Sequence, residues 1–170
     1  MPDESTARVT LAMVGLGRMG ANLVRRAMRE GHSCVVYDPQ PAAVSALTAE
    51  GAVGASDLAD LVSRLPQPRT VWVMVPAGHI TDSVVTELTA LLSPGDCLID
   101  GGNSYYRDDI RRAQAAGEAG IDYLDVGTSG GVWGLDRGYC LMIGGPTPAV
   151  DRLTPLWDTI APGVDTAART

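Results

Sequence analysis

Gly15, Gly17 and Gly20 are spaced as G-x-G-x-x-G between an apolar run and a segment with helical periodicity. In that setting the first glycine permits a tight turn, the second lets backbone approach a pyrophosphate, and the third lets the helix pack on the strand. Free N–H groups and the helix dipole then bind the anion without a charged side chain. The spacing predicts a dinucleotide-binding turn made of Gly15, Leu16, Gly17, Arg18, Met19 and Gly20.

An acidic residue stands where the sugar of a dinucleotide is expected. Asp38 follows a short β-branched run, and roughly 20 residues beyond the glycine turn a carboxylate can accept hydrogen bonds from the adenosine ribose hydroxyls. The same charge would repel a 2′-phosphate, and the next three residues, Pro39, Gln40 and Pro41, offer no arginine to offset it. We therefore expect NAD as the preferred cofactor, with NADP possible. The alternative is a glycine turn that only packs a helix, with Asp38 a solvated strand end.

Three further segments follow predicted strands and are expected at the same edge of the sheet. Val75-Pro76-Ala77 ends a strand where the strand order should reverse, so it is expected to line the dinucleotide cleft, although a plain turn would explain it as well. Asp100-Gly101-Gly102-Asn103-Ser104 and the run from Asp125 to Gly131 combine paired glycines with uncharged donors. That composition suits a polyhydroxy or carboxylate substrate. Sharp strand–helix connections, with Ser104 as a helix cap, are the alternative.

The elements that must position these residues alternate short apolar runs with helical patterns. Strands are predicted at 9–14, 33–37, 51–54, 70–75, 97–100, 123–126 and 139–143, and helices at 19–30, 41–49, 56–65, 81–92, 104–119 and 149–160. Strands separated by helices indicate parallel pairing with crossover connections. We predict an α/β fold of the Rossmann type, a doubly wound, mostly parallel sheet with helices on both faces.

Composition excludes several classes of protein. The 170 residues carry a net charge of −7, which argues against nucleic-acid or anionic-membrane partners. Cys34, Cys97 and Cys140 lie in apolar runs without histidine neighbours, so they are expected to be buried free thiols, with no disulfide framework and no metal site. No apolar run is long enough to span a membrane and no signal peptide is evident, so a cytoplasmic protein is expected. All thirteen basic residues are arginine.

Four blocks, in this order, resemble the N-terminal domain of decarboxylating 6-phosphogluconate dehydrogenase, within the β-hydroxyacid dehydrogenase superfamily. They are G-L-G-R-M-G-A-N-L, V-V-Y-D, D-G-G-N-S-Y-Y-R-D and D-V-G-T-S-G-G-V-W-G-L-D-R-G-Y-C-L-M-I-G-G, spread over residues 11–145. The last two blocks discriminate: the wider superfamily has proline and valine before the serine, where this chain has Gly127 and Thr128. The Tyr37-Asp38 strand end is similar to the NAD-preferring branch.

The resemblance implies an activity and a set of contacts. The family oxidises the C3 hydroxyl of 6-phosphogluconate with hydride transfer to the nicotinamide, and the β-keto acid then loses CO₂ to give ribulose 5-phosphate in the pentose phosphate pathway. The cofactor contacts would be residues 15–20, Asp38, 75–77 and Asn103. The substrate contacts would be Asn103, Ser129, Gly130 and Gly131.

The same resemblance implies what this chain lacks. The family's general base is a lysine and its general acid a glutamate, both on helices beyond this domain, so no catalytic residue is expected here. We expect residues 1–160 to be the dinucleotide-binding domain and 161–170 a tail or linker toward a helical domain that would also form a homodimer or higher homo-oligomer. Arg107, Arg111 and Arg112 are expected to be a solvated helix face, since the phosphate-binding arginines come later.

Two other functions remain open at this point. A 3-hydroxyisobutyrate-type β-hydroxyacid dehydrogenase shares the glycine turn and a serine-glycine-glycine loop. A non-catalytic NAD sensor would need the glycine turn and Asp38, but not the loops that contain Asn103 and Ser129.

Overall fold

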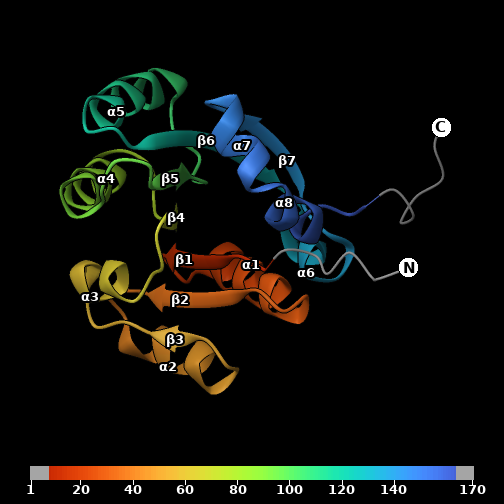
Figure 1. Cartoon of the computed structure of the whole chain (residues 1–170). Coiled ribbons are helices and arrows are strands. Elements are labelled where there is room, and N and C mark those ends of the chain that lie inside the picture. The colour runs from red at the N-terminus through yellow and green to blue at the C-terminus, as the bar shows by residue number, and fades with distance from the viewer. Residues whose placement is uncertain (1–7, 164–170) are drawn as a thin grey trace, which may run out of the picture.

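Seven strands form one sheet, and the structure, a computed structural model, describes residues 8–163. The strands are β1 (Thr10–Val14), β2 (Ser33–Tyr37), β3 (Val53–Gly54), β4 (Thr70–Val73), β5 (Cys97–Asp100), β6 (Asp122–Ser129) and β7 (Cys140–Gly144). Their order is β3-β2-β1-β4-β5-β6-β7 (Figure 1). All neighbours pair in parallel except β6 and β7, which are antiparallel. The predicted doubly wound, mostly parallel sheet is confirmed.

Helices cover both faces of the sheet. They are α1 (Arg18–Arg29), α2 (Pro41–Ala49), α3 (Leu58–Ser63), α4 (His79–Leu91), α5 (Tyr106–Glu118), α6 (Gly134–Arg137), α7 (Thr147–Arg152) and α8 (Thr154–Ile160), with a 3-10 turn at Gly131–Trp133. Alternate residues of β1 serve the two faces: Leu11 and Met13 pack with α1, α2, α7 and α8, whereas Ala12 and Val14 pack with α3, α4 and α5. The strand period of two therefore builds two cores.

The strand order reverses beside β1. From β1 the chain crosses to β2 on one side, and β4 pairs with the other side of β1. In sheets of this kind, ligands bind outside the carboxyl ends of the strands at such a switch point. The ends of β1 and β4, which lead into the glycine turn and into residues 74–78, therefore mark the crevice.

Several local expectations were wrong. The single helix predicted over 149–160 is two helices, α7 and α8, and α8 has Pro155 in its first turn. Asp57, and not Ser56, caps α3, because its carboxylate accepts the Asp60 N–H at 2.7 Å. The strand predicted to end at residue 126 continues to Ser129, so residues 127–129 belong to β6 and not to the loop that follows it. Of the expected tail, residues 164–170 lie outside the described residues.

The cysteines divide into two kinds. Cys34 and Cys97 are buried, and burial raises the pKa of each thiol to about 12. Cys140 is exposed, contrary to expectation, because it starts the edge strand β7. Across residues 8–163 no helix has the length and apolar character needed to cross a membrane.

Candidate cofactor and substrate site

The glycine turn joins β1 to α1, and its three glycines are needed for different reasons. Gly15 has a φ of 93°, and a Cβ there would collide with the Met74 carbonyl. A Cβ at Gly20 would collide with the Gly15 carbonyl oxygen. Gly17, the N-cap of α1, has an ordinary φ of −62°, and a Cβ there would have no atom within 4 Å. Gly15 and Gly20 are thus required by packing, whereas Gly17 keeps open the space in front of the helix.

A cavity of about 380 Å³ lies in front of this turn. It is lined by Gly17, Arg18, Met19, Gly20, Met74, Val75, Pro76, Gly101, Gly102, Asn103 and Thr128. The first N–H groups of a helix have no partner within the helix, so the start of α1 presents donors at this wall. Segments far apart in the sequence meet here, as the prediction required. Leu16 is buried behind the turn, and Ala77 is not among the lining residues.

Asp38 lies on the other side of the glycine turn and supports it. Its Oδ2 accepts the Leu16 N–H at 2.8 Å, and its Oδ1 accepts the Gln40 N–H at 2.8 Å. The carboxylate also lines a second cavity of about 370 Å³, with Tyr37, Pro39, Pro41, Val44, Ser45, Ala55 and Ser56. Sequence reasoning assigned Asp38 to a sugar and missed its role in fixing the turn. The first cavity is lined by residues of the glycine turn, and the second is lined by the carboxylate that hydrogen-bonds to that turn.

The loop after β5 is held by the residue that begins it. Asp100, 1% exposed, accepts the Gly102 N–H at 2.9 Å through Oδ1 and the Ser104 hydroxyl at 2.6 Å through Oδ2. The expected cap by Ser104 is therefore wrong: α5 begins at Tyr106, and Ser104 bonds to Asp100 instead. With both ends of the loop fixed to one carboxylate, Asn103 stands exposed at the cavity wall.

The expected solvated face of arginines is only partly correct. Arg107 and Arg111 are exposed, but Arg112 is 3% exposed. Its guanidinium lies against Asp82, Asp100 and Asp109. Helical periodicity could have separated Arg112 from Arg111, because Asp109, Arg112 and Ala116 share one buried face of α5.

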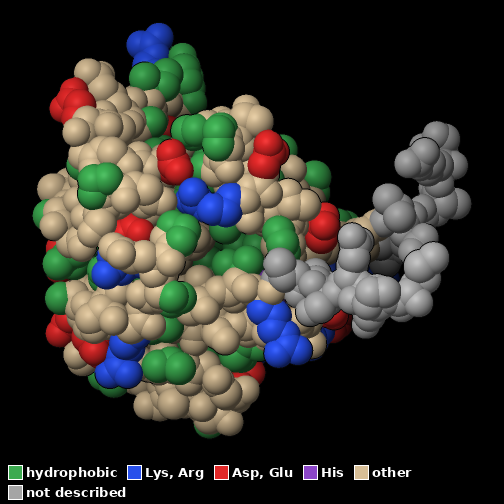
Figure 2. All heavy atoms as spheres, in the orientation of Figure 1, with side chains coloured by type: hydrophobic (Ala, Val, Ile, Leu, Met, Phe, Trp, Pro, Cys, Tyr) green, Lys and Arg blue, Asp and Glu red, His purple; other side chains and the backbone are tan. Residues whose placement is uncertain are grey.

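The serine-glycine-glycine run lies beyond the described cavity wall. Ser129 ends β6 and is exposed, and Gly130 and Gly131 follow it. Thr128 lines the cavity in their place. A Cβ at Gly130 would collide with the Tyr139 ring, so packing alone accounts for that glycine. Figure 2 shows basic side chains scattered among acidic ones on the visible described surface, without a continuous basic patch there.

The domain belongs to the dinucleotide-binding Rossmann class. Three features define that class here: the order of the strands, the glycine-spaced turn between β1 and α1, and the acidic residue after β2. The family described as "NAD binding domain of 6-phosphogluconate dehydrogenase" matches residues 10–167. The chain belongs to this family.

Proteins with similar sequences are named as 6-phosphogluconate dehydrogenases. An NAD(+)-dependent, decarboxylating 6-phosphogluconate dehydrogenase of Haloferax volcanii is 44% identical over 155 residues, which cover 91% of this chain and 51% of that protein. A decarboxylating 6-phosphogluconate dehydrogenase of Treponema pallidum is 40% identical over 160 residues, covering 91% and 33%. The chain therefore spans between a third and a half of the length of these relatives.

Solved structures show the same fold. A Plasmodium falciparum 6-phosphogluconate dehydrogenase superposes with a TM-score of 0.86 at 26% identity, covering 93% of this chain and 35% of that one. A Mycobacterium tuberculosis 3-hydroxyisobutyrate dehydrogenase superposes with a TM-score of 0.85 at 27% identity, covering 92% and 53%. The fold alone thus does not separate the two kinds of dehydrogenase, whereas the family match and the named relatives do.

Proposed function

We propose that this chain is the cofactor-binding half of a decarboxylating 6-phosphogluconate dehydrogenase that prefers NAD to NADP. The main support for this preference is the position of the Asp38 carboxylate. It accepts the Leu16 N–H of the glycine turn at 2.8 Å and lines the second cavity. A fixed negative charge there favours ribose hydroxyls and disfavours a 2′-phosphate. The NAD(+)-dependent relative from Haloferax volcanii supports the same preference.

The residues fit a dinucleotide. The backbone at Gly17, Arg18 and Met19 would hold the pyrophosphate, with Gly17 giving it room, while the Leu16 N–H stays bonded to Asp38 and fixes the turn. The adenosine half would occupy the cavity beside Asp38. The nicotinamide half would occupy the cavity walled by Val75, Pro76 and Asn103, with Ala77 at its margin. When bound, NAD supplies a hydride acceptor, and this chain's residues bind and orient it.

The substrate would meet the cofactor at the same edge of the sheet. We assign Asn103, Ser129, Gly130 and Gly131 to 6-phosphogluconate, on the strength of the family's motifs. Thr128, which lines the cavity, is an additional uncharged donor. The chain contains no lysine, so a lysine base must come from outside it. Residues 1–160 would be the cofactor domain, and a helical domain would complete the site and form the homodimer.

Cofactor preference is tested by calorimetric titration of this chain with NAD and NADP. We expect NAD to bind more tightly and neither cofactor to support turnover of 6-phosphogluconate. Equal affinities would contradict the preference. Ribulose 5-phosphate formed by the chain alone would contradict the requirement for outside residues.

The substrate is tested on the full-length protein that carries this domain. We expect reduction of NAD with 6-phosphogluconate, with release of CO₂ and ribulose 5-phosphate. Reduction with 3-hydroxyisobutyrate, and not with 6-phosphogluconate, would reassign the enzyme to the second kind of dehydrogenase. NAD binding without turnover of either substrate would favour a sensor.

A further inference from the structure

Arg112, on the buried face of α5, contacts groups from two other parts of the chain. Its Nη1 donates to Asp100 Oδ2 at 3.2 Å, and its Nε donates to Asp82 Oδ1 at 2.8 Å. Nη2 lies 3.5 Å from the Gly78 carbonyl oxygen, and Nη1 lies 3.4 Å from Asp109 Oδ1. One guanidinium therefore connects α5 with the end of β5 and with the start of α4.

Two of these partners, Asp100 and Gly78, do not line the 380 Å³ cavity but are close in sequence to segments that do, residues 101–103 and 74–76. Asp100 holds the Gly102 N–H and the Ser104 hydroxyl, and so sets the loop that presents Asn103. Gly78 directly follows residues 75–77 and precedes α4. The two walls also lie against each other, since a Cβ at Gly102 would come within 3.1 Å of the Val75 carbonyl oxygen. Through Asp100 and Gly78, Arg112 thus connects residues 101–104 with residues 75–77 on the side away from the cavity.

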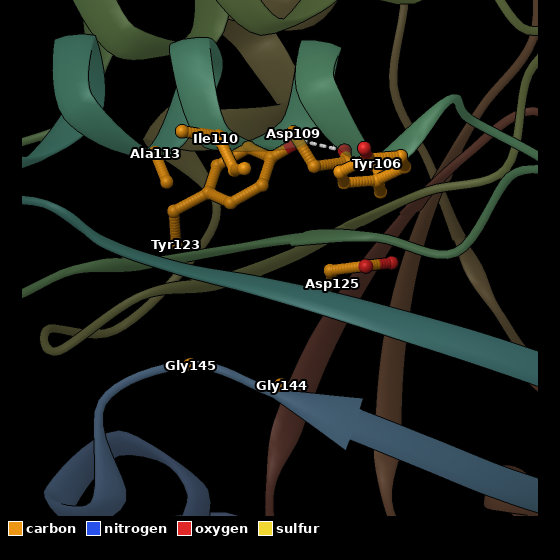
Figure 3. Close-up of a pocket in the computed structure, with 8 residues that line it drawn as sticks. All are labelled: Tyr106, Asp109, Ile110, Ala113, Tyr123, Asp125, Gly144 and Gly145. Carbon is orange, nitrogen blue, oxygen red and sulfur yellow. Dashed lines mark hydrogen bonds between the residues drawn. The ribbon is translucent and has the colours of Figure 1, made fainter.

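The surroundings of Arg112 make it hard to replace. Asp100 and Asp109 are both buried, at 1% and 5% exposure, and Arg112 is the cation between them. The Tyr123 hydroxyl lies 3.3 Å from Asp100 and donates to Asp109 at 2.8 Å (Figure 3). Burial, with Asp100 nearby, raises the pKa of Asp109 to about 6 although the Tyr123 hydrogen bond opposes this. Removal of the cation would leave buried carboxylates facing each other.

We propose that Arg112 is a positioning residue for the nicotinamide half of the cofactor, acting through Asp100 on residues 101–104 and through Gly78 on residues 75–77. It touches neither cavity directly and does not reach the Asp38 side of the turn. The proposal rests on the proposed function in taking NAD as the ligand. It predicts that loss of Arg112 affects one half of the dinucleotide and spares the other.

The test compares Arg112→Met with Arg111→Met in this chain. Arg111 is the matched control, because it also pairs with Asp82, at 3.1 Å, but is 60% exposed in its side chain. Each variant is titrated with NAD and with AMP, which occupies only the Asp38 side. We expect Arg112→Met to weaken NAD roughly tenfold or more and to leave AMP unchanged, whereas Arg111→Met leaves both unchanged. Unchanged NAD affinity, or equal loss of NAD and AMP, overturns the proposal.

A second readout needs no ligand, so it separates this proposal from failure of the proposed function. In amide NMR spectra, Arg112→Met should shift the signals of residues 75, 77, 78 and 101–104 and spare those of 15–20 and 35–38. Spectra without shifts at the two walls overturn the proposal even if wild-type protein binds NAD.

A conservative variant covers the case in which Arg112→Met does not fold. Arg112→Lys keeps the charge but cannot bridge Asp82 and Asp100 with a planar fork. We expect it to fold and to bind NAD with intermediate affinity, with smaller shifts at the same amides. Wild-type NAD affinity and unshifted wall amides in Arg112→Lys overturn the proposal.

Discussion

The glycine turn and the Asp100 loop face the same cavity but are fixed in different ways. The turn over residues 15–20 is shaped by backbone: Gly15 and Gly20 avoid collisions with main-chain atoms, and within residues 8–163 Asp38 is the side chain that hydrogen-bonds to it. The loop over residues 100–104 is shaped by side chains, with Asp100 at its centre and Arg112 behind it. A phosphate needs only oriented amides, whereas a substrate and a nicotinamide need donors at chosen positions.

Gly20→Ala tests whether main-chain packing determines the glycine turn. The new Cβ would collide with the Gly15 carbonyl, and because both partners are backbone the turn must move. We expect a loss of about 2–3 kcal/mol in the free energy of unfolding, together with loss of NAD binding. Urea denaturation and calorimetry measure the two effects. Gly117→Ala in α5, where a Cβ meets nothing within 4 Å, is the control and should not destabilise. Equal stability of both variants would refute a backbone-determined turn.

Gly17→Val separates binding from folding within the same turn. Its φ of −62° suits valine, and its Cβ would point into open space. We expect the affinity for NAD to fall roughly a hundredfold, about 2.7 kcal/mol, while the thermal midpoint stays at the wild-type value. Titration and thermal unfolding of one preparation give both numbers. Wild-type affinity in Gly17→Val would place the pyrophosphate elsewhere.

Asp38→Asn tests the side chain that hydrogen-bonds to the glycine turn. Asparagine keeps an oxygen that can accept the Leu16 N–H but removes the charge. We expect the affinity for NAD to fall roughly tenfold or less, and the preference over NADP to narrow. Competitive titration of the two cofactors measures this ratio. An unchanged ratio would mean that the charge does not select the cofactor.

The smallest expected effect is a pH dependence in the network behind the Asp100 loop. The pKa of Asp109 is raised from 3.8 to about 6, mainly by burial. A carboxyl with a raised pKa in the folded state stabilises it most when protonated, so its contribution is full below pH 3.8 and is lost as the pH rises through about 6. Asp109→Asn should remove this decline in the free energy of unfolding. Urea unfolding at pH 4, 5, 6 and 7 tests it, and parallel curves for both proteins would count against the assignment.

The two loops also show how far sequence reasoning reaches. The glycine turn, Asp38 and the sheet were predictable because strand period and glycine spacing are local signals. The role of Asp100 in fixing the loop was not predictable, because Ser104 is a residue type that commonly caps helices. Only the fold shows that the Ser104 hydroxyl donates to Asp100. Arg112 was misassigned because charged residues on a helix usually face solvent, and its partners Asp82 and Asp100 lie on other elements. The family motifs named Ser129, whereas the described cavity wall includes Thr128.

Asp38 both lines the second cavity and hydrogen-bonds to the glycine turn, and this limits how the cofactor preference can be changed. The carboxylate that we propose faces the ribose is also the acceptor for the Leu16 amide inside the glycine turn. A cation or a small residue at position 38 could admit a 2′-phosphate, but it would also remove the acceptor for the Leu16 N–H. The affinity of the turn for both NAD and NADP is then expected to fall. Redesign toward NADP therefore requires two changes made together, a new acceptor for the Leu16 amide and a new cation beside the ribose, and an intermediate with only one of them is expected to bind either cofactor poorly.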